Sequence, residues 1–235
     1  MKYKHLFFDL DNTLWDFARN SHETFNELYR DHLSEQETIP SFEAFFDAYT
    51  IHNTRLWGLY RENQITKDEL KDTRFLMTLK EFGIDDIKLA STLSDEYTYR
   101  SPRKGLLFPG TIEMLEQLKN RFKLHIITNG FEEIQHVKLE FAGLTKYFEC
   151  LITSEQAGSK KPDAGIFYYA MEKAGAKAEE SLMIGDDLDV DIIGARAVGM
   201  GTLLFDPYNI YVASDDPTQR VSRISDILIF IDKKN

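Results

Sequence analysis

The sequence predicts an α/β fold, a Rossmann-like doubly wound parallel sheet that carries an inserted α-helical cap domain. Short apolar runs recur along the chain as candidate buried strands, and patterns typical of helices lie between the later runs. A long helical stretch interrupts this alternation after the first run. Strands that alternate with helices indicate a parallel sheet with both faces covered.

The expected strands are short and apolar. In chain order they are "HLFF" (5–8), "KLHII" (123–127), "FECLI" (148–152), "SLMI" (181–184) and "GTLLF" (201–205). Helical patterns follow in "TIEMLEQLKNRF", "EEIQHVKLEFAG", "AGIFYYAMEKAG" and "DVDIIGARAVG", and Gly closes some of them, as helix C-termini favour. The tail from Ser222 predicts a closing helix or strand at the sheet edge. Cys150, the single cysteine, is interpreted as a small core residue.

Residues 16–101 are predicted to form the cap domain, because Leu, Phe, Tyr and Trp recur there at helical spacing. The core domain then comprises residues 1–15 and 102–235. Trp57, Tyr60 and Phe75 are interpreted as core side chains of the cap, and Arg61, Asn63 and Arg74 as part of its solvated face.

Composition limits the partners. The chain has 235 residues and a formal net charge of -11, which argues against a nucleic-acid polymer as partner. A small anionic substrate remains possible, because one metal ion and one Lys can reverse the field locally. No segment approaches the ~20 apolar residues of a membrane span, and the start shows no cleavable signal. We expect a cytoplasmic protein without a membrane partner, as a monomer or homodimer.

Polar residues follow three of the expected strands, at the ends where ligands bind in open parallel sheets. They are Asp9 and Asp11, then Thr128 and Asn129, then Asp186 and Asp187. A loop that contains Pro162 presents Lys160 and Lys161, and Lys161, beside the proline, is the better candidate to reach the same crevice.

Several carboxylates in one crevice repel each other, and a divalent cation removes the conflict. Oxygen ligands with few neutral donors suit Mg²⁺, which takes one or two carboxylates and a substrate phosphate oxygen. A carboxylate can attack phosphorus without losing a proton at neutral pH and so form an acyl-phosphate. The metal and the Lys would neutralise the phosphoryl oxygens in the transition state.

The segments "DLDNT", "TN", "KKPD" and "GDDLDVD" resemble the four motifs of the haloacid dehalogenase superfamily, in its phosphatase branch. Their order and spacing match the family along the whole chain. The resemblance implies an Mg²⁺-dependent phosphatase that acts on a small phosphorylated metabolite through an aspartyl-phosphate.

By position, the resemblance implies a role for each motif residue. Asp9 would be the nucleophile and Asp11 the acid/base, with its carbonyl also a metal ligand. Thr13 would steady the loop and contribute to substrate binding, Thr128 and Asn129 would bind phosphate, and Lys161 would bridge nucleophile and phosphate. Asp9 and Asp186 would ligate the metal, with Asp187 as second choice and Asp191 oriented behind them.

The segments "IITNGFEEIQHVKLEFAGLTKYFECLITSEQAGSKKPDAGIFYYA" and "LWGLYRENQIT" are similar to the cytoplasmic pyrimidine 5′-nucleotidases of this superfamily. A sugar-phosphate or acylneuraminate-phosphate phosphatase stays open, as does a phosphomutase, because the core determines the reaction and the cap selects the leaving group. Asp11 and Asp186 argue against a C–Cl dehalogenase. A receiver-like phospho-acceptor module is the non-enzyme alternative, but it has no use for an ~85-residue helical insertion.

Overall fold

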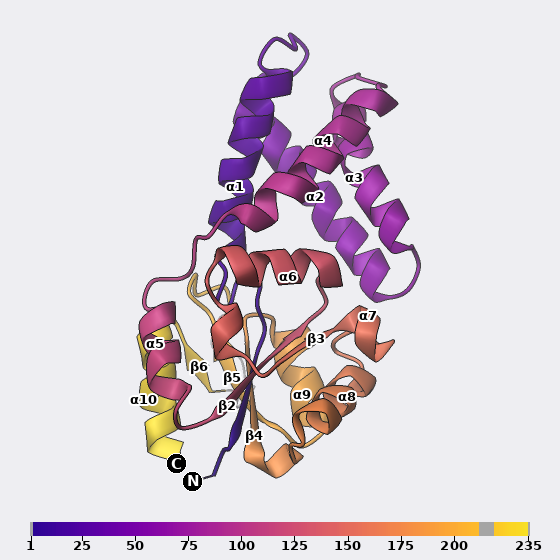
Figure 1. Ribbon diagram of the computed structural model, residues 1–235. Helices are drawn as coiled ribbons and strands as arrows, with labels where there is room; N and C mark the ends of the chain where they lie inside the picture. Colours follow the sequence, from indigo (N-terminus) through magenta and orange to yellow (C-terminus); the bar gives the residue numbers. More distant parts are fainter. Residues whose placement is uncertain (1, 212–218, 235) are drawn as a thin grey trace. The chain divides into compact units, whose positions relative to one another are not determined.

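A computed structural model describes residues 2–211 and 219–234. The chain divides into two compact units: an α/β unit formed by Met1–Phe17 and Gly105–Asn235, and a helical unit, Ala18–Lys104 (Figure 1). Within the part of the chain that is described, no helix is both long and apolar enough to cross a membrane.

The α/β unit is built on one parallel sheet of six strands in the order β3-β2-β1-β4-β5-β6. The strands are β1 (His5–Phe8), β2 (Lys123–Thr128), β3 (Cys150–Thr153), β4 (Ser181–Gly185), β5 (Gly201–Phe205) and β6 (Arg220–Val221). The predicted α/β class is confirmed, and the five predicted strands occur within two residues of their expected bounds. The two-residue strand β6 was not predicted.

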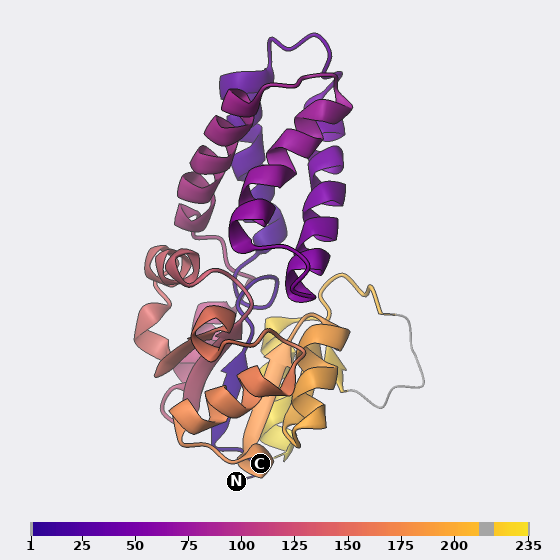
Figure 2. The same cartoon turned by 90° about the vertical axis from the view of Figure 1, so that its right-hand side faces the viewer.

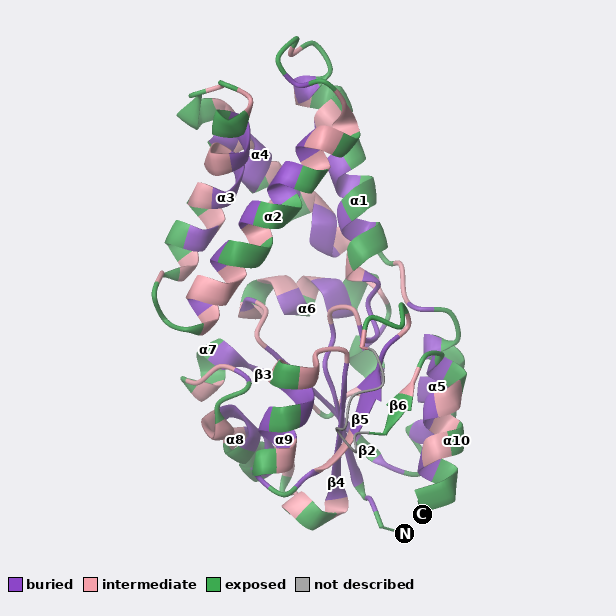
Figure 3. Cartoon of the chain, turned by 180° about the vertical axis from the view of Figure 1, so that it is seen from behind, coloured by how far each residue is buried: buried purple, intermediate pink, exposed green. Residues whose placement is uncertain are grey.

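Alternate side chains of the strands point to opposite faces of the sheet, and each face is covered by helices (Figure 2). Leu6 and Phe8 of β1 pack with α5 (Thr111–Leu118), α6 (Glu132–Phe141) and α10 (Ile224–Lys234). Phe7 packs on the other face with α8 (Ala164–Ala174) and α9 (Gly194–Ala197). The central strands β1, β2 and β4 are therefore buried on both sides, whereas the edge strand β6 is not and is drawn in green (Figure 3).

Short helical segments connect these elements. They are α7 (Ser154–Ala157), η3 (Thr145–Tyr147), η4 (Ala178–Glu180) and η5 (Leu188–Ile193), the last of which runs directly into α9. A further short segment, η2 (Ser101–Arg103), follows α4 (Ile87–Arg100) in the helical unit. The tail predicted as a helix or strand forms helix α10. The sequence pattern did not predict α7, whose four residues are too few for a recognisable helical period.

The helical unit contains four helices: α1 (Phe17–Leu28, with η1 Tyr29–Leu33), α2 (Phe42–Arg61), α3 (Lys67–Glu81) and α4 (Ile87–Arg100). Its core includes Phe25, Tyr49 and Phe75. Arg74 was interpreted as solvated, but it is only 6% exposed and lies over the ring of Tyr97 at 5.0 Å. The aliphatic stem and flat guanidinium of Arg can pack among rings, which a charge-based interpretation of the sequence overlooks.

Two buried histidines lie side by side on β1 and β2. Their rings stack with centroids 5.4 Å apart, and His5 Nδ1 lies 3.1 Å from His125 Nε2. Burial, together with the charges of His5 and Lys123, lowers the pKa of His125 to about 4. Burial also lowers the pKa of His5, so both imidazoles are mainly uncharged at pH 7 and repel each other only when protonated in acid.

This pair predicts a loss of stability in mild acid. The folded-state pKa of His125 lies below the ordinary histidine value of 6.5, so the unfolded chain binds the proton first as the pH falls. The stabilisation is complete above pH 6.5 and declines towards pH 4, by up to about 1.4 kcal/mol per pH unit. Urea unfolding of the unaltered protein and His125→Gln across this range should give a shallower pH dependence for the variant. Parallel curves would contradict the assignment.

Candidate active site

Three adjacent strands bring the predicted polar residues together. Strand β1 lies between β2 and β4 in the sheet. Asp9 follows β1 directly, and its backbone N–H donates to Ile184 O at 2.9 Å, which continues the pairing with β4. Thr128 is the last residue of β2, and Asp186 follows the last residue of β4. The carboxyl ends of the strands thus place these side chains side by side.

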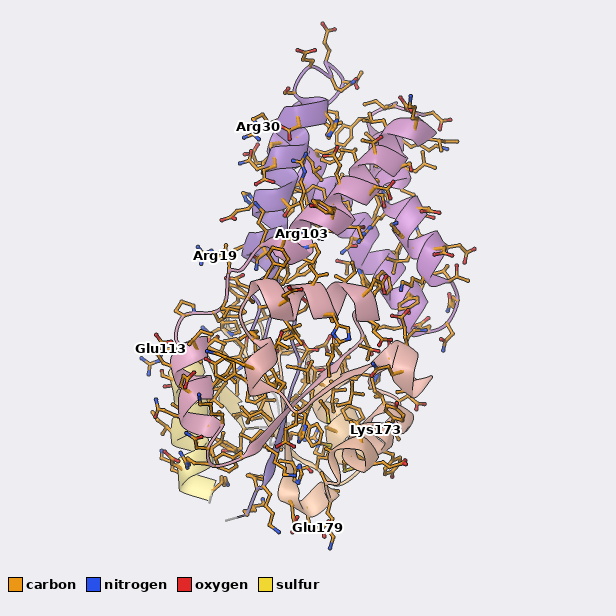
Figure 4. The ribbon with its side chains drawn as sticks, viewed as in Figure 1. Arg19, Arg30, Arg103, Glu113, Lys173 and Glu179 are labelled. Carbon is orange, nitrogen blue, oxygen red and sulfur yellow. The ribbon has the colours of Figure 1, made fainter. Side chains whose placement is uncertain are left out.

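Lys161 joins two of the carboxylates. Its Nζ donates to Asp9 Oδ1 at 2.5 Å, to Asp191 Oδ1 at 2.5 Å and to Ile127 O at 2.9 Å. The side chain is 2% exposed, whereas charged side chains such as Lys173 point outward from the α/β unit (Figure 4). Burial alone would lower the pKa of Lys161, but Asp191 and Asp9 outweigh it and raise the pKa. Lys161 therefore stays protonated, and its ammonium group is hydrogen-bonded to all three acceptors.

The side chain of Asn129 fixes the backbone of Lys161. Asn129 Nδ2 donates to Lys161 O at 2.9 Å, and Asn129 Oδ1 accepts from Lys161 N at 2.8 Å. The resemblance implies a phosphate-binding role for Asn129, and the second N–H of its Nδ2 remains able to donate. Thr128 Oγ1 accepts from Gly130 N at 3.0 Å, which leaves the hydroxyl proton of Thr128 able to donate to a ligand.

The two acids considered for the position after β4 differ in their surroundings. Asp187 Oδ1 accepts from the backbone N–H groups of Asp189 and Val190, both at 3.0 Å, and so caps η5. Asp186 instead accepts from Thr13 Oγ1 at 3.2 Å and belongs with Asp9 and Asp191 to a group whose ligand atoms lie within 4.8 Å of one another. The geometry favours Asp186 as the metal ligand.

Asp191 lies behind this group with both carboxylate oxygens in use. Oδ1 accepts from Lys161, and Oδ2 accepts from the Asp187 backbone N–H at 3.2 Å. Gly185 makes this position possible, because a Cβ there would lie 2.2 Å from Asp191 Oδ2. The last residue of β4 must therefore lack a side chain for Asp191 to reach Lys161.

The three acids carry more negative charge than one lysine can balance. Burial, reinforced by Asp191 and Asp11 and opposed by Lys161, raises the pKa of Asp9 to about 8. Burial together with Asp9 and Asp191 raises the pKa of Asp186 to about 9. Both shifts arise chiefly because burial penalises the ionised carboxylates, and a divalent cation bound beside them would favour the ionised forms.

The available atoms fit a hard divalent cation. Asp9 Oδ2, Asp186 Oδ2 and the carbonyl oxygen of Asp11 accept no hydrogen bond from any residue that the structure describes. Oxygen donors of this kind, two of them carboxylates, suit Mg²⁺, which keeps waters in its remaining positions.

The sequence analysis missed two partners of Asp11, both on α6. Lys138 Nζ donates to Asp11 Oδ1 at 2.6 Å, and Gln135 Nε2 donates to Asp11 Oδ2 at 3.0 Å. Both residues are buried, on the same helix face as Leu139. The available signal was a Lys and a Gln three residues apart on the apolar side of a predicted helix, where a solvated role is unexpected.

Comparisons with known proteins show to which family the chain belongs. The model of the haloacid dehalogenase-like hydrolases matches residues 3–199. The chain is 34% identical to pyrimidine 5′-nucleotidase PynA of Streptococcus pneumoniae, over 99% of this chain and 97% of that protein. It is 33% identical to pyrimidine 5′-nucleotidase YjjG of Escherichia coli, over 86% and 85% of the two chains.

A solved structure extends the agreement to three dimensions. The magnesium-bound HAD hydrolase YfnB of Bacillus subtilis matches with a TM-score of 0.87 and 28% identity, over 99% of this chain and 100% of that chain. These matches confirm the resemblance inferred from the four motifs. The chain belongs to the haloacid dehalogenase-like hydrolases, as an enzyme of their phosphatase branch.

Proposed function

We propose that the protein is an Mg²⁺-dependent phosphomonoester hydrolase that acts through an aspartyl-phosphate on Asp9. The observation that carries the proposal is Lys161, buried and bonded to both Asp9 and Asp191 at 2.5 Å. A cation fixed beside a strand-end carboxylate can bind a phosphoryl group and hold the carboxylate for attack on phosphorus.

The chain's own groups divide the reaction between them. One carboxylate oxygen of Asp9 attacks phosphorus, the bond from phosphorus to the leaving oxygen breaks, and Asp11 protonates that oxygen. Asp11 then removes a proton from water, which attacks the phosphorus of the aspartyl-phosphate and regenerates Asp9. Lys161, held against Asp9, offsets the charge of the phosphoryl group, and the hydroxyl of Thr128 donates to a phosphoryl oxygen.

Asp9, Asp186 and the Asp11 carbonyl would hold the metal, with Asp191 orienting Lys161 behind them. When bound, Mg²⁺ supplies charge neutralisation of the phosphoryl oxygens.

The metal site predicts a stability effect besides the effect on activity. EDTA should abolish phosphate release and Mg²⁺ should restore it. Mg²⁺ should also stabilise the fold by about 2.7 kcal/mol at 100 times its Kd, because it offsets the repulsion among the acids. Thermal unfolding with and without Mg²⁺ measures this shift. Asp186→Asn should lose most of it, while the capping variant Asp187→Asn should keep it. Indifference to chelation would remove the metal from the proposal.

The substrate that we propose is a pyrimidine nucleoside 5′-monophosphate. The similarity to two pyrimidine 5′-nucleotidases, each over more than four-fifths of both chains, supports it. The broader proposal, a small phosphorylated metabolite as substrate, accords with the names of the same relatives. A cytoplasmic location stays a prediction.

Phosphate release from a panel of substrates tests this choice. The panel contains pyrimidine and purine nucleoside monophosphates, sugar phosphates and acylneuraminate phosphate, compared by kcat/KM in the presence of Mg²⁺. We expect the highest values for the pyrimidine nucleotides. A preference for sugar phosphates would keep the reaction and replace the substrate, and no turnover of any phosphomonoester would overturn the proposed function.

A further inference from the structure

The carboxylate of Asp11 is held from one side by a single helix. Lys138 and Gln135 of α6 each donate to a different oxygen of Asp11, at 2.6 Å and 3.0 Å. They lie three residues apart and therefore share one helix face. Two donors from one rigid element fix both the position and the rotation of the carboxylate.

Lys138 is buried beside Asp11 and Trp15. It is 5% exposed, and its Nζ lies 4.3 Å from the ring centroid of Trp15, which is itself fully buried. Among the described residues, Asp11 is the only carboxylate that forms an ion pair with Lys138. A buried ammonium needs a compensating partner, so Lys138 is committed to Asp11 and to the face of the indole ring.

Gln135 also occupies a specific space. Its Oε1 is buried with no hydrogen-bond partner among the described residues. The side chain's one hydrogen bond is therefore the donation from Nε2 to Asp11. Gly130 leaves the room for it, because a Cβ at that position would lie 1.6 Å from Gln135 Nε2. A buried oxygen without a hydrogen-bond partner destabilises the fold. Gln135 therefore lowers stability at the same position where its Nε2 donates to Asp11.

We infer that Lys138 and Gln135 are positioning residues for proton transfer by Asp11. The inference rests on the proposed function, in which Asp11 protonates the leaving oxygen and later deprotonates water. The charged contact to Oδ1 is the stronger of the two, so Lys138 holds the carboxylate while the neutral contact to Oδ2 is the one that yields to substrate or water. Oδ2 is then the oxygen that gives and takes the proton.

Two substrates with different leaving groups separate this role from a structural one. Uridine 5′-monophosphate leaves a primary alkoxide, which must be protonated as the bond to phosphorus breaks. p-Nitrophenyl phosphate leaves a phenolate that needs little protonation. The ratio kcat/KM reports the steps through departure of the leaving group, whereas kcat also includes hydrolysis of the aspartyl-phosphate.

Lys138→Met keeps the apolar contact with Trp15 and removes the ammonium. We expect its kcat/KM to fall at least about 30-fold for uridine 5′-monophosphate and less than about 3-fold for p-nitrophenyl phosphate, since general acid catalysis contributes about 10² to 10⁴. Its kcat should fall for both substrates, with a burst of p-nitrophenol, because activation of water is slowed as well. Gln135→Leu should show the same pattern with smaller losses.

Lys119→Met serves as the matched control, because Lys119 pairs with Glu116 on the surface. This variant should keep the kcat and kcat/KM of the unaltered enzyme on both substrates. The inference would be overturned if both Lys138→Met and Gln135→Leu lost kcat/KM equally on the two substrates, or lost none on either. The proposed function would survive that outcome. If the unaltered enzyme hydrolysed neither substrate, the proposed function would fail and this inference with it.

Discussion

Asp9→Asn is expected to reduce phosphate release by a factor on the order of 10⁴ or more while leaving the protein folded. An amide of the same shape cannot attack phosphorus, and it removes one of the three clustered acids. Asn has the shape of Asp and keeps a side-chain oxygen that can accept from Lys161 Nζ, so the packing at this position should be retained. Steady-state phosphate release and thermal unfolding, on the same preparation, measure both effects.

The controls for this variant are simple. Its melting temperature should stay within about 4 °C of the unaltered protein, which corresponds to about 1 kcal/mol at this chain length. Asp232→Asn, which alters a surface ion pair with Arg121, should keep full activity. Mass spectrometry should verify that the introduced amide has not hydrolysed back to the carboxylate. Activity above a few per cent in a verified sample would remove Asp9 as the nucleophile.

Lys161→Met should damage stability and activity together. The variant leaves Asp9 and Asp191 buried without their shared cation, and removing one partner of a buried ion pair costs about 3–5 kcal/mol. The loss of the cation beside the phosphoryl group should reduce phosphate release about 10³-fold. Urea unfolding and phosphate release at pH 8 measure the two effects.

The pH dependence of this variant has a definite sign. Burial raises the pKa of Asp191 and Lys161 opposes that rise, so the folded variant holds protons on both acids more tightly than the unfolded chain does. Its stability should therefore increase as the pH falls from 8 to 5.5, and the gap to the unaltered protein should narrow. Lys160→Met, at the neighbouring position, should change stability by no more than about 0.5 kcal/mol. Equal losses in the two lysine variants would show that Lys161 has no special role.

The strand ends were predictable because the signal for them is local. "HLFF" is buried at every position, and the acid that follows such a run must lie at the edge of the sheet. The same argument placed Asp186 without knowledge of any contact. The choice of Asp186 over Asp187 needed the structure, because it depends on which carboxylate caps η5.

The contacts of Asn129, Lys138 and Arg74 could not be predicted in the same way. Asn129 meets the backbone of a residue 32 positions later, and Lys138 meets Asp11 across 127 positions. Sequence periodicity shows which face of a helix is apolar, but not that one Lys on that face is balanced by an acid from another element. Arg74 is buried among rings for a similar reason, since its partners come from other helices.

The position of β1 in the sheet also bears on how the protein is made. This strand is the first to be synthesised, yet both of its neighbours, β2 and β4, begin more than a hundred residues later. At about 5–20 residues per second, the ribosome needs roughly ten seconds to deliver β2. Residues of the helical unit emerge during that interval, and their contacts lie close together in sequence. We therefore expect the helical unit to fold on the nascent chain before β2 is available to pair with β1. During that interval "HLFFDLD" is an unpaired apolar segment, so we expect a chaperone to bind there.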